Sequence, residues 1–306
     1  MLAFRDPNGI RPLVIGINET TDGPEYIVAS ESVALDVLGF KLLRDVEPGE
    51  IIIVDEDGLH SYKPFLAVHK RSCIFEYIYF ARPDSFVDGR NVYEVRKAIG
   101  AELADESLIN ADMVIPIPDS GVPAAIGFAQ RSKLPFELGL IRNHYVGRTF
   151  IEPTDEIRHL GVKLKHNANK QRLEGQKIIL VDDSIVRGTT SRKIVEMVRQ
   201  AGAREVHMRI SSPPTINPCF YGIDTPDRDQ LLAAQFDVEG IRKQIQADTL
   251  SFISIDGLYR AMGETNRDND LPQFCDACFT GEYPIPLSDQ EKGQSNTQMS
   301  FLAGLK

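Results

Sequence analysis

Short apolar runs alternate with amphipathic stretches through the second half of the chain. The run from Ile178 to Val181 predicts a strand buried on both faces, and after a polar turn Ile194, Val195 and Val198 recur at helical spacing. Similar patterns predict further helices and strands, the helices over 92–106 and 123–130 and the strands over 112–118, 136–141 and 204–210. Strands that alternate with helices of this length indicate βαβ units, so we expect an α/β fold with a parallel sheet flanked by helices.

The beginning of the chain has a different, β-rich pattern. Apolar runs separated by turn residues predict strands over 1–4, 13–17, 26–30 and 50–55, with one short helix over 32–38. Near residue 71 the pattern changes to alternating strand and helix, and a mostly polar tail follows Pro286. We therefore predict three segments, which are 1–70, 71–285 and 286–306.

Two adjacent carboxylates, Asp182 and Asp183, end the apolar run at 178–181. A turn rich in hydroxyls and backbone amides then leads into the helix: Ser184, Ile185, Val186, Arg187, Gly188, Thr189 and Thr190. Such a turn directs unpaired N–H groups and the positive end of the helix dipole at an anion, usually a phosphate. Because the acidic pair would repel that anion, we infer that it faces sugar hydroxyls or a divalent cation. The alternative is an acidic helix N-terminus with a Ser or Thr cap.

Two more polar loops follow predicted strands. The loop 118–125 contains Asp119, Ser120 and Gly121 and enters a helix, so it offers N–H groups to an anion. Considered alone, the loop is better explained as a plain strand-to-helix turn with an Asp or Ser cap, but together with the acidic motif the anion-binding interpretation is favoured. The loop 142–171 is long and carries the greatest concentration of basic residues, which favours a lid over a polyphosphate site. A solvated basic surface loop is the alternative. We assign its histidines to the lid surface without a metal role: His144, His159 and His166.

Composition and charge narrow the class of ligand. The net charge of −10 over 306 residues argues against a nucleic-acid-binding surface and favours small-molecule substrates. No apolar run approaches the ~18 residues that cross a bilayer, and no basic region followed by an apolar stretch opens the chain, so we expect a cytoplasmic protein without a membrane partner. Four cysteines without a signal peptide are expected to be reduced thiols or metal ligands rather than disulfides.

The motif VDDSIVRGTTS at 181–191 resembles the phosphoribosyl pyrophosphate (PRPP) site of type I phosphoribosyltransferases, and in this wording it resembles that of the amidophosphoribosyltransferase family. The stretches RDPNGIRPL, ASESVALD and RDVEPGEI, at 5–13, 29–36 and 44–51, resemble the last third of that family's glutaminase domain. The resemblance implies a type I phosphoribosyltransferase fold preceded by part of an N-terminal-nucleophile glutaminase sandwich. The aromatic-rich stretch 75–85 resembles the family's joining segment. We predict an apolar strand and a turn there, without a catalytic role.

The resemblance also implies roles for single residues. Asp182 and Asp183 would hold the ribose hydroxyls and, with Ser120, place Mg²⁺, while the residues from Ser184 to Thr190 wrap the 5-phosphate. The loop of Asp119, Ser120 and Gly121 would bind pyrophosphate. The stretch RNHYVGRTF at 142–150 matches the family's catalytic flexible loop, which implies that three of its side chains reach the pyrophosphate or shield the reacting centre: Arg142, Tyr145 and Arg148.

The cysteines include one C-x-x-C pair, Cys275 and Cys278, which by itself fits a redox motif, half a metal site or two bystanders. With Cys73 and Cys219 the total is four, the number that a tetrahedral Zn²⁺ or a [4Fe–4S] cluster needs, although their separation in sequence does not show that they meet. Some amidophosphoribosyltransferases bind a [4Fe–4S] cluster in the contexts found here, RSCIFEY, NPCFYGID and FCDACFTG. The resemblance therefore implies a structural cluster on these four residues, with unligated thiols as the alternative.

The activity implied is displacement of pyrophosphate from PRPP by ammonia, with glutamine as the source of ammonia in intact enzymes, to give 5-phosphoribosylamine in the first step of purine biosynthesis. The family hydrolyses glutamine with an N-terminal cysteine, whereas this chain begins Met1-Leu2, so we expect a chain that lacks the start of the glutaminase domain and its half-reaction. The family further implies inhibition by purine nucleotides and a homo-oligomer, a tetramer. A salvage phosphoribosyltransferase or a PRPP-sensing regulator are the alternatives.

Overall fold

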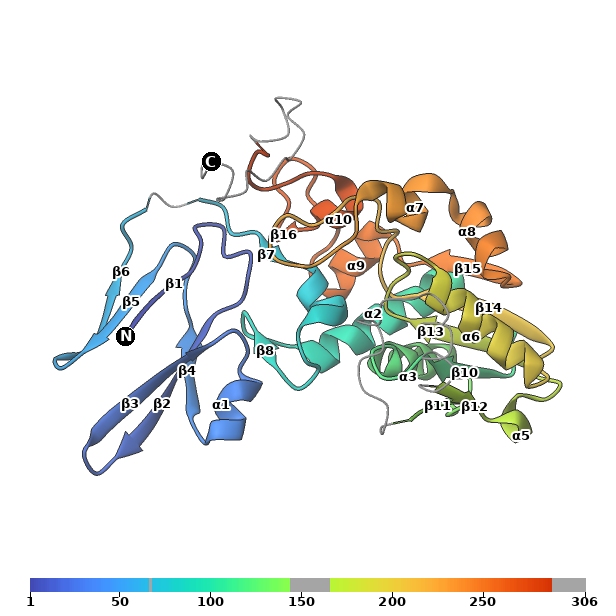
Figure 1. Cartoon of the computed structure of the whole chain (residues 1–306), viewed down its shortest axis with the longest axis horizontal. Helices are drawn as coiled ribbons and strands as arrows, with labels where there is room; N and C mark the ends of the chain where they lie inside the picture. Colours follow the sequence, from blue (N-terminus) through green and yellow to red (C-terminus); the bar gives the residue numbers. More distant parts are fainter. Residues whose placement is uncertain (66–67, 144–165, 288–306) are drawn as a thin grey trace, which may run out of the picture.

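The computed structural model describes residues 1–65, 68–143 and 166–287. Figure 1 shows two lobes, with blue strands on one side and a sheet covered by helices on the other. The first lobe holds two antiparallel sheets of three strands. One has the order β1 (Leu2–Phe4), β5 (Ile51–Asp55), β6 (Gly58–Tyr62), and the other β3 (Gly23–Ala29), β2 (Val14–Thr20), β4 (Lys41–Asp45), with helix α1 (Val33–Leu38) beside it. These bounds confirm the strands and the helix predicted here.

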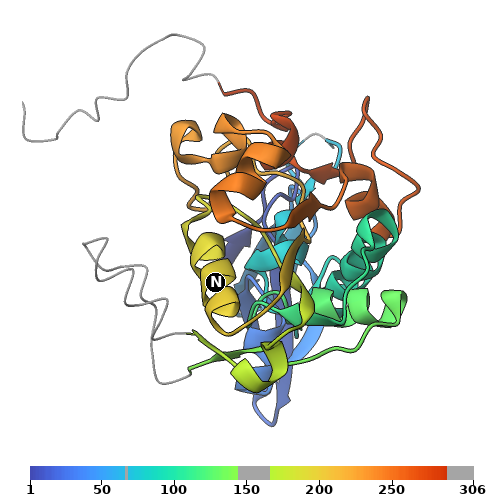
Figure 2. The same cartoon turned by 90° about the vertical axis from the view of Figure 1, so that its right-hand side faces the viewer.

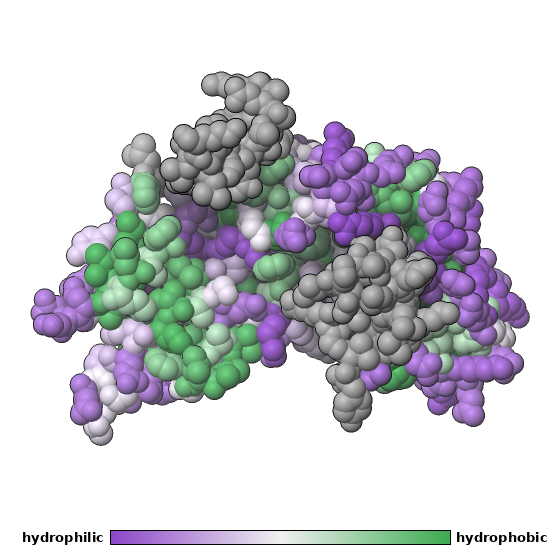
Figure 3. Space-filling view, viewed as in Figure 1, coloured by the Kyte–Doolittle hydropathy of each residue, from purple (hydrophilic) through white to green (hydrophobic). Residues whose placement is uncertain are grey.

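The first lobe has a small core and an apolar outer surface. Ile15, Val46 and Ile52 form the fully buried centre between the two sheets. Alternation along β1 places Ala3 toward this core and leaves Leu2 and Phe4 66% and 70% exposed. Figure 3 shows the resulting gathering of apolar side chains over this lobe, in contrast to the polar surface of the other lobe.

The second lobe is built on a parallel sheet of four strands in the order β10, β13, β14, β15. Their bounds are β10 (Met113–Pro116), β13 (Lys177–Asp182), β14 (Glu205–Ile210) and β15 (Thr249–Phe252). Alternate residues of β13 face two separate cores, with Ile179 and Val181 in one and Ile178 and Leu180 in the other. The strand is therefore buried on both faces, as the unbroken apolar run predicted.

Helices cover both faces of this sheet, as Figure 2 shows with green helices on one side and the yellow helix on the other. The first face is covered by α2 (Val92–Ser107), α3 (Val122–Ser132) and α9 (Ile255–Ala261), and the second by α6 (Thr189–Gln200) and α8 (Val238–Ile245). Shorter elements complete the lobe: β8 (Phe86–Val87), β9 (Arg90–Asn91), α5 (Lys170–Leu173), η3 (Arg228–Gln230) and α7 (Leu232–Gln235). None of the helices in the described ranges is long and apolar enough to cross a membrane.

Two predicted strands were wrong. The stretch predicted at 136–141 touches the parallel sheet through a bridge between Phe136 and Val114, and the ladder does not continue because Pro116 of β10 has no N–H to donate to the Glu137 carbonyl. It continues as β11 (Leu140–Arg142), which pairs antiparallel with β12 (His166–Ala168). The stretch predicted as a strand after Phe75 is a π-helix, η1 (Glu76–Phe80), whose carbonyl groups bind a buried arginine.

The two lobes are joined close to residue 71. There β7 (Ser72–Cys73) pairs in parallel with β16 (Phe274–Cys275), which is followed by α10 (Ala277–Thr280). The start and the end of the second lobe therefore lie side by side, and this pairing brings together residues about 200 positions apart in the sequence.

Candidate functional site

The acidic pair lies at the carboxyl end of β13, between the ends of β10 and β14. Asp182 and Asp183 are both only 7% exposed. The Asp182 side chain accepts a hydrogen bond from the Asp183 N–H at 3.0 Å, and the Asp183 carboxylate accepts one each from Ser120 Oγ at 2.5 Å and Ser184 Oγ at 2.6 Å. Ligands of open parallel sheets bind beyond this edge, so the pair stands at the expected position for a site.

Burial raises the pKa of the Asp182 carboxyl well above its usual range, and the neighbouring Asp183 raises it further. Two carboxylates held together away from water repel each other, and the cost falls if a cation binds between them or if one of them is protonated. The pair is thus electrostatically suited to a divalent cation.

The loop before α3 is fitted tightly against the pair. Gly121 has no side chain, and a Cβ atom there would collide with the Val181 carbonyl oxygen and lie 2.9 Å from that of Ile117. This close approach lets Ser120 reach Asp183 from a loop 63 residues away in sequence. The structure therefore brings together Ser120, Asp182 and Asp183, the three residues predicted to place Mg²⁺.

The turn after the acidic pair leaves its amides available. Within the described part of the chain, no backbone N–H from Ser184 to Gly188 donates a hydrogen bond. Gly188 has a φ of +74°, a conformation that glycine adopts without strain, and it is the N-cap of α6. Ile185 is buried, whereas Arg187 and Thr189 are exposed. The turn is a backbone cradle at a helix N-terminus, a common arrangement for phosphate.

The basic loop begins at β11. Arg142 forms an ion pair with Asp119 of the neighbouring loop. Tyr145 and Arg148, the other two predicted catalytic residues, lie outside the described residues, as do His144 and His159. His166 was wrongly predicted at the lid surface: it is 5% exposed, and its Nε2 lies 3.3 Å from the Pro118 carbonyl oxygen. It is buried because β12 carries it back against the loop that follows β10.

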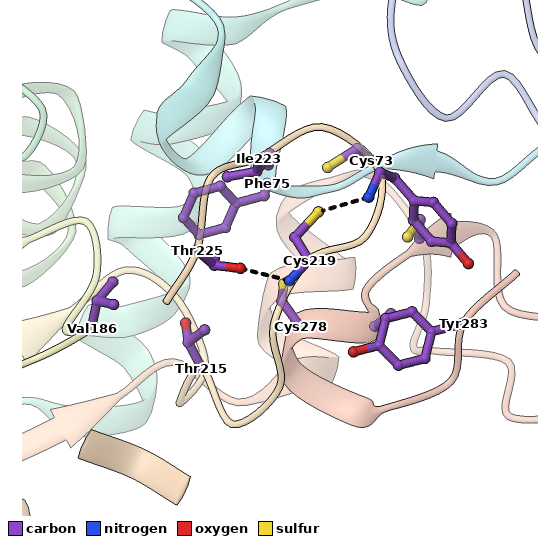
Figure 4. Close-up of a pocket in the computed structure, with 12 residues that line it drawn as sticks. Cys73, Phe75, Val186, Thr215, Cys219, Ile223, Thr225, Cys278 and Tyr283 are labelled. Carbon is purple, nitrogen blue, oxygen red and sulfur yellow. Dashed lines mark hydrogen bonds between the residues drawn. The ribbon is translucent and has the colours of Figure 1, made fainter. Parts of the chain in front are cut away.

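The four cysteines line one cavity (Figure 4). The β7–β16 pairing sets Cys73 opposite Cys275, and α10 supplies Cys278. Cys219 comes from the segment after β14, where its N–H donates to Thr225 Oγ1 at 2.7 Å and its Sγ accepts from the Tyr221 N–H at 3.4 Å. The tertiary structure thus gathers thiols that the sequence spaces far apart.

The thiol cavity is apolar. Phe75, Val186 and Ile223 contribute to its walls. Burial raises the pKa of the Cys73 thiol to about 12 and that of Cys275 to about 11. In the absence of a metal these groups are therefore neutral thiols, and only a strongly bound cation would hold them as thiolates.

Sequence reasoning missed the charged network behind the C-x-x-C pair. Asp276, between the two cysteines, is fully buried and accepts hydrogen bonds from Arg267 Nε at 2.6 Å and Tyr259 Oη at 2.8 Å. Arg267 also pairs with Glu282 at 2.6 Å. Asp276 is visible in the motif, but its partners are distant or lack any pattern in the sequence, so no local signal reveals the network.

At both candidate metal sites, the acidic pair and the thiol cavity, the question is whether the side chains can complete the ligand set of a metal. Among the residues that the structure describes, no three His, Cys, Asp or Glu side chains are arranged to hold a metal ion. A Mg²⁺ ion takes most of its ligands from substrate and water, so two carboxylates suffice for it. A [4Fe–4S] cluster is held by four cysteine thiolates, and four thiols are available in the cavity.

Comparisons with known proteins agree with this arrangement. The profile described as a phosphoribosyl transferase domain matches residues 84–211, which contain the acidic pair, its turn and the loop of Ser120. The fold of this part of the chain is therefore that of a phosphoribosyltransferase domain. Over 99% of its length the chain is 57% identical to the amidophosphoribosyltransferase of Rhizobium etli, and over 94% it is 51% identical to that of Bacillus subtilis.

A solved structure extends the match to three dimensions. It is described as glutamine PRPP amidotransferase from Bacillus subtilis complexed with ADP and GMP, and it superposes with a TM-score of 0.84 at 51% identity over 94% of this chain. The chain belongs to the amidophosphoribosyltransferase family. It spans 62% and 59% of the two curated relatives and 62% of the solved chain, or about three fifths of each.

Proposed function

We propose that this chain catalyses the displacement of pyrophosphate from PRPP by ammonia, which gives 5-phosphoribosylamine for purine biosynthesis. The observation that carries the proposal is the position of the buried pair Asp182 and Asp183 between the loop of Ser120 and the turn from Ser184 to Gly188, whose backbone amides donate no hydrogen bond among the described residues. An acidic centre between two anion-binding loops is complementary to a ribose that carries phosphate groups at both ends.

Each loop has a distinct task in this reaction. The turn from Ser184 to Thr190 binds the 5-phosphate through its amides and the α6 N-terminus, and the loop of Asp119, Ser120 and Gly121 receives the pyrophosphate. The acidic pair orients the ribose hydroxyls. Arg142 stands beside Asp119 and reaches the pyrophosphate if that ion pair opens. Tyr145 and Arg148 belong to the same proposal as residues that shield the reacting centre.

The chemical step breaks the bond between C1 and the pyrophosphate oxygen and forms one between C1 and nitrogen. The bonding electrons leave with pyrophosphate, and the new C1 ammonium group loses one proton to solvent. Since ammonia is already a nucleophile, the main demands are neutralisation of the departing charge and exclusion of water. Mg²⁺ held by Asp182, Asp183 and Ser120 would supply part of that neutralisation.

We also propose that Cys73, Cys219, Cys275 and Cys278 hold a [4Fe–4S] cluster. The support is their convergence on one apolar cavity, which matches the ligand set of such a cluster. The cluster would link β7, the segment after β14 and α10, and so stabilise the closure of the second lobe. Its proposed role is structural.

We also make proposals about the nitrogen donor, the inhibitors, the assembly and the location of this protein. No cysteine precedes Cys73 in this chain, so we propose ammonia rather than glutamine as its nitrogen donor. The description of the Bacillus subtilis structure names ADP and GMP, which supports purine nucleotides as inhibitors. We further propose a homo-oligomer, a cytoplasmic location, and segment boundaries near residues 70 and 285.

The test is pyrophosphate release from PRPP, Mg²⁺ and ammonia, measured on the 306-residue protein. We expect release that depends on all three components. The double variant Asp182→Asn, Asp183→Asn is expected to lose it while keeping the circular dichroism spectrum of the folded protein. Unchanged ammonia-dependent release in this variant would exclude the acidic pair from the site.

A further inference from the structure

A buried arginine connects the joint between the lobes to the candidate site. Arg96, in the second turn of α2, is 4% exposed. Its Nε donates to the Tyr77 carbonyl at 2.9 Å, and its Nη2 donates to the Ala81 carbonyl at 2.6 Å and the Glu76 carbonyl at 3.5 Å. All three acceptors belong to η1 or its C-terminal cap.

Arg96 is unusual for a buried arginine because its hydrogen bonds go to backbone carbonyl groups. Within the described ranges, Arg96 makes no salt bridge with a carboxylate, and its Nη1 donates no hydrogen bond. A buried cation without a charged partner is costly, so it is retained in a structure chiefly where its position matters. Burial lowers the pKa of Arg96, and among nearby groups the charge of Asp183 opposes this most strongly.

The segment that Arg96 binds is held on its other side by the first lobe. Arg11 pairs with Glu76 at 2.7 Å and stacks over the Phe80 ring at 4.4 Å. Just beyond η1, the Glu31 carboxylate accepts from the Arg82 N–H at 2.7 Å. In Figure 1 this cyan segment lies between the strands of the first lobe and the start of α2.

Helices α2 and α3, which lie between Arg96 and the site, are closely packed. A Cβ atom at Gly100 of α2 would collide with the Ala124 carbonyl of α3, and one at Gly127 of α3 would collide with the Lys97 carbonyl of α2. The two helix backbones are therefore in direct contact. Since α3 begins directly after Gly121, the position of α2 constrains the loop from which Ser120 donates to Asp183.

We propose that Arg96 is a positioning residue. It holds the segment 76–81, which joins the two lobes, against α2, and it thereby sets the position of the Ser120 loop relative to the acidic pair. The inference rests on the proposed function, because the alignment that Arg96 would maintain is that of ammonia, C1 and the departing pyrophosphate in the proposed reaction. Misplacement of reacting groups by ~1 Å costs about 100-fold in rate, so such a residue affects turnover more than substrate binding.

The test compares Arg96→Met with Arg131→Met in the ammonia-dependent reaction. Arg131 is an exposed residue of α3 that pairs with Asp105 and has no part in the site. We expect Arg96→Met to lower kcat by about 10- to 100-fold with KM for PRPP within about threefold of wild type. Arg131→Met is expected to keep both constants. Arg96→Lys retains the charge and one hydrogen bond and is expected to recover part of kcat.

Hydrogen exchange provides a readout that does not depend on activity. In Arg96→Lys we expect several-fold faster exchange both of the backbone amides in 76–81 and of those of Gly121 and Val122, which donate to the Ile117 and Asp119 carbonyls, because the two segments are linked through α2 and α3. Faster exchange in 76–81 alone, or wild-type kcat in Arg96→Met, would overturn the proposal. A wild-type protein without ammonia-dependent release would refute the proposed function instead, and the exchange data would still decide the role of Arg96.

Discussion

Ser120 donates a hydrogen bond to Asp183 with an Oγ–Oδ1 distance of 2.5 Å, although 63 positions separate the two residues in the sequence. The bond fixes one carboxylate oxygen of the acidic pair and joins the loop after β10 to the loop after β13. Two strands of one parallel sheet thus present their carboxyl ends to a single centre.

Removal of the Ser120 hydroxyl tests this relationship. In Ser120→Ala we expect the Mg²⁺ concentration at half-maximal ammonia-dependent activity to rise by about tenfold, the effect of losing ~1.5 kcal/mol from one hydrogen bond to a charged group. Mg²⁺ titration of pyrophosphate release measures it. Ser132→Ala, which removes a hydroxyl bonded to the Ala129 carbonyl, is the control and should match wild type. An unchanged titration for Ser120→Ala would separate Ser120 from the metal site.

Gly121→Ala is expected to destabilise the fold, because its Cβ would collide with the Val181 carbonyl. The backbone must move, so we expect a loss of about 1–3 kcal/mol in the free energy of unfolding. Gly58→Ala is the comparison: nothing lies within 4 Å of its Cβ, and only its φ of +111° is unfavourable. Denaturant unfolding measures both. A smaller loss for Gly121→Ala than for Gly58→Ala would show that the close approach is unimportant.

The pH dependence of stability has an identifiable source in the first lobe. Burial alone would raise the pKa of Glu50, but hydrogen bonds from Arg44, Ser61 and the Glu47 N–H outweigh it and lower the pKa from 4.5 to about 2. A carboxyl with a lowered folded pKa stabilises the native state above pH 4.5, and this contribution is lost as the pH falls toward 2. We therefore expect Glu50→Gln to be less stable than wild type at pH 7.

The same variant should converge on wild type in acid. Because the amide does not titrate, the difference in unfolding free energy between Glu50→Gln and wild type is expected to shrink between pH 4.5 and pH 2. Urea unfolding across this range measures the difference. A difference that stays constant with pH would mean that Glu50 stabilises by packing alone.

The convergence of the four cysteines on one cavity predicts that the protein binds iron. Protein prepared without air is expected to bind about four iron atoms per chain, and Cys278→Ser is expected to bind few and to unfold at a lower temperature. Iron analysis and thermal unfolding check this on the same samples. Iron-free wild-type protein with the same unfolding temperature as Cys278→Ser would exclude a structural cluster.

The buried charged network around Asp276 is expected to stabilise the fold whether or not a metal is bound. Arg267→Met leaves the fully buried Asp276 without its cation, which is expected to cost about 3–5 kcal/mol of unfolding free energy. Arg260→Met is the matched control, since Arg260 is more than a third exposed and its pairs with Glu102 and Glu106 should be worth under about 1 kcal/mol. Equal losses in the two variants would contradict the buried network.

Some features followed from local pattern. The run 178–181 indicated a doubly buried strand because only apolar residues tolerate burial on both faces, and β13 confirmed it. The strand at 136–141 was wrong because an apolar run does not reveal whether the neighbouring strand has free backbone groups beside it. The stretch after Phe75 forms a π-helix whose carbonyl groups accept hydrogen bonds from Arg96, a contact between residues distant in sequence that no local pattern reveals.

The sequence by itself determined the α/β class, the strand-turn-helix at Asp182 and Asp183, and the family, since each depends on residues close together in the chain. Only the tertiary structure decided that Ser120 meets Asp183, that the four cysteines share one cavity, and that Arg96 spans the joint. Those relationships depend on which strands and helices pack together, which is set by the shape and burial of the whole chain rather than by any local pattern.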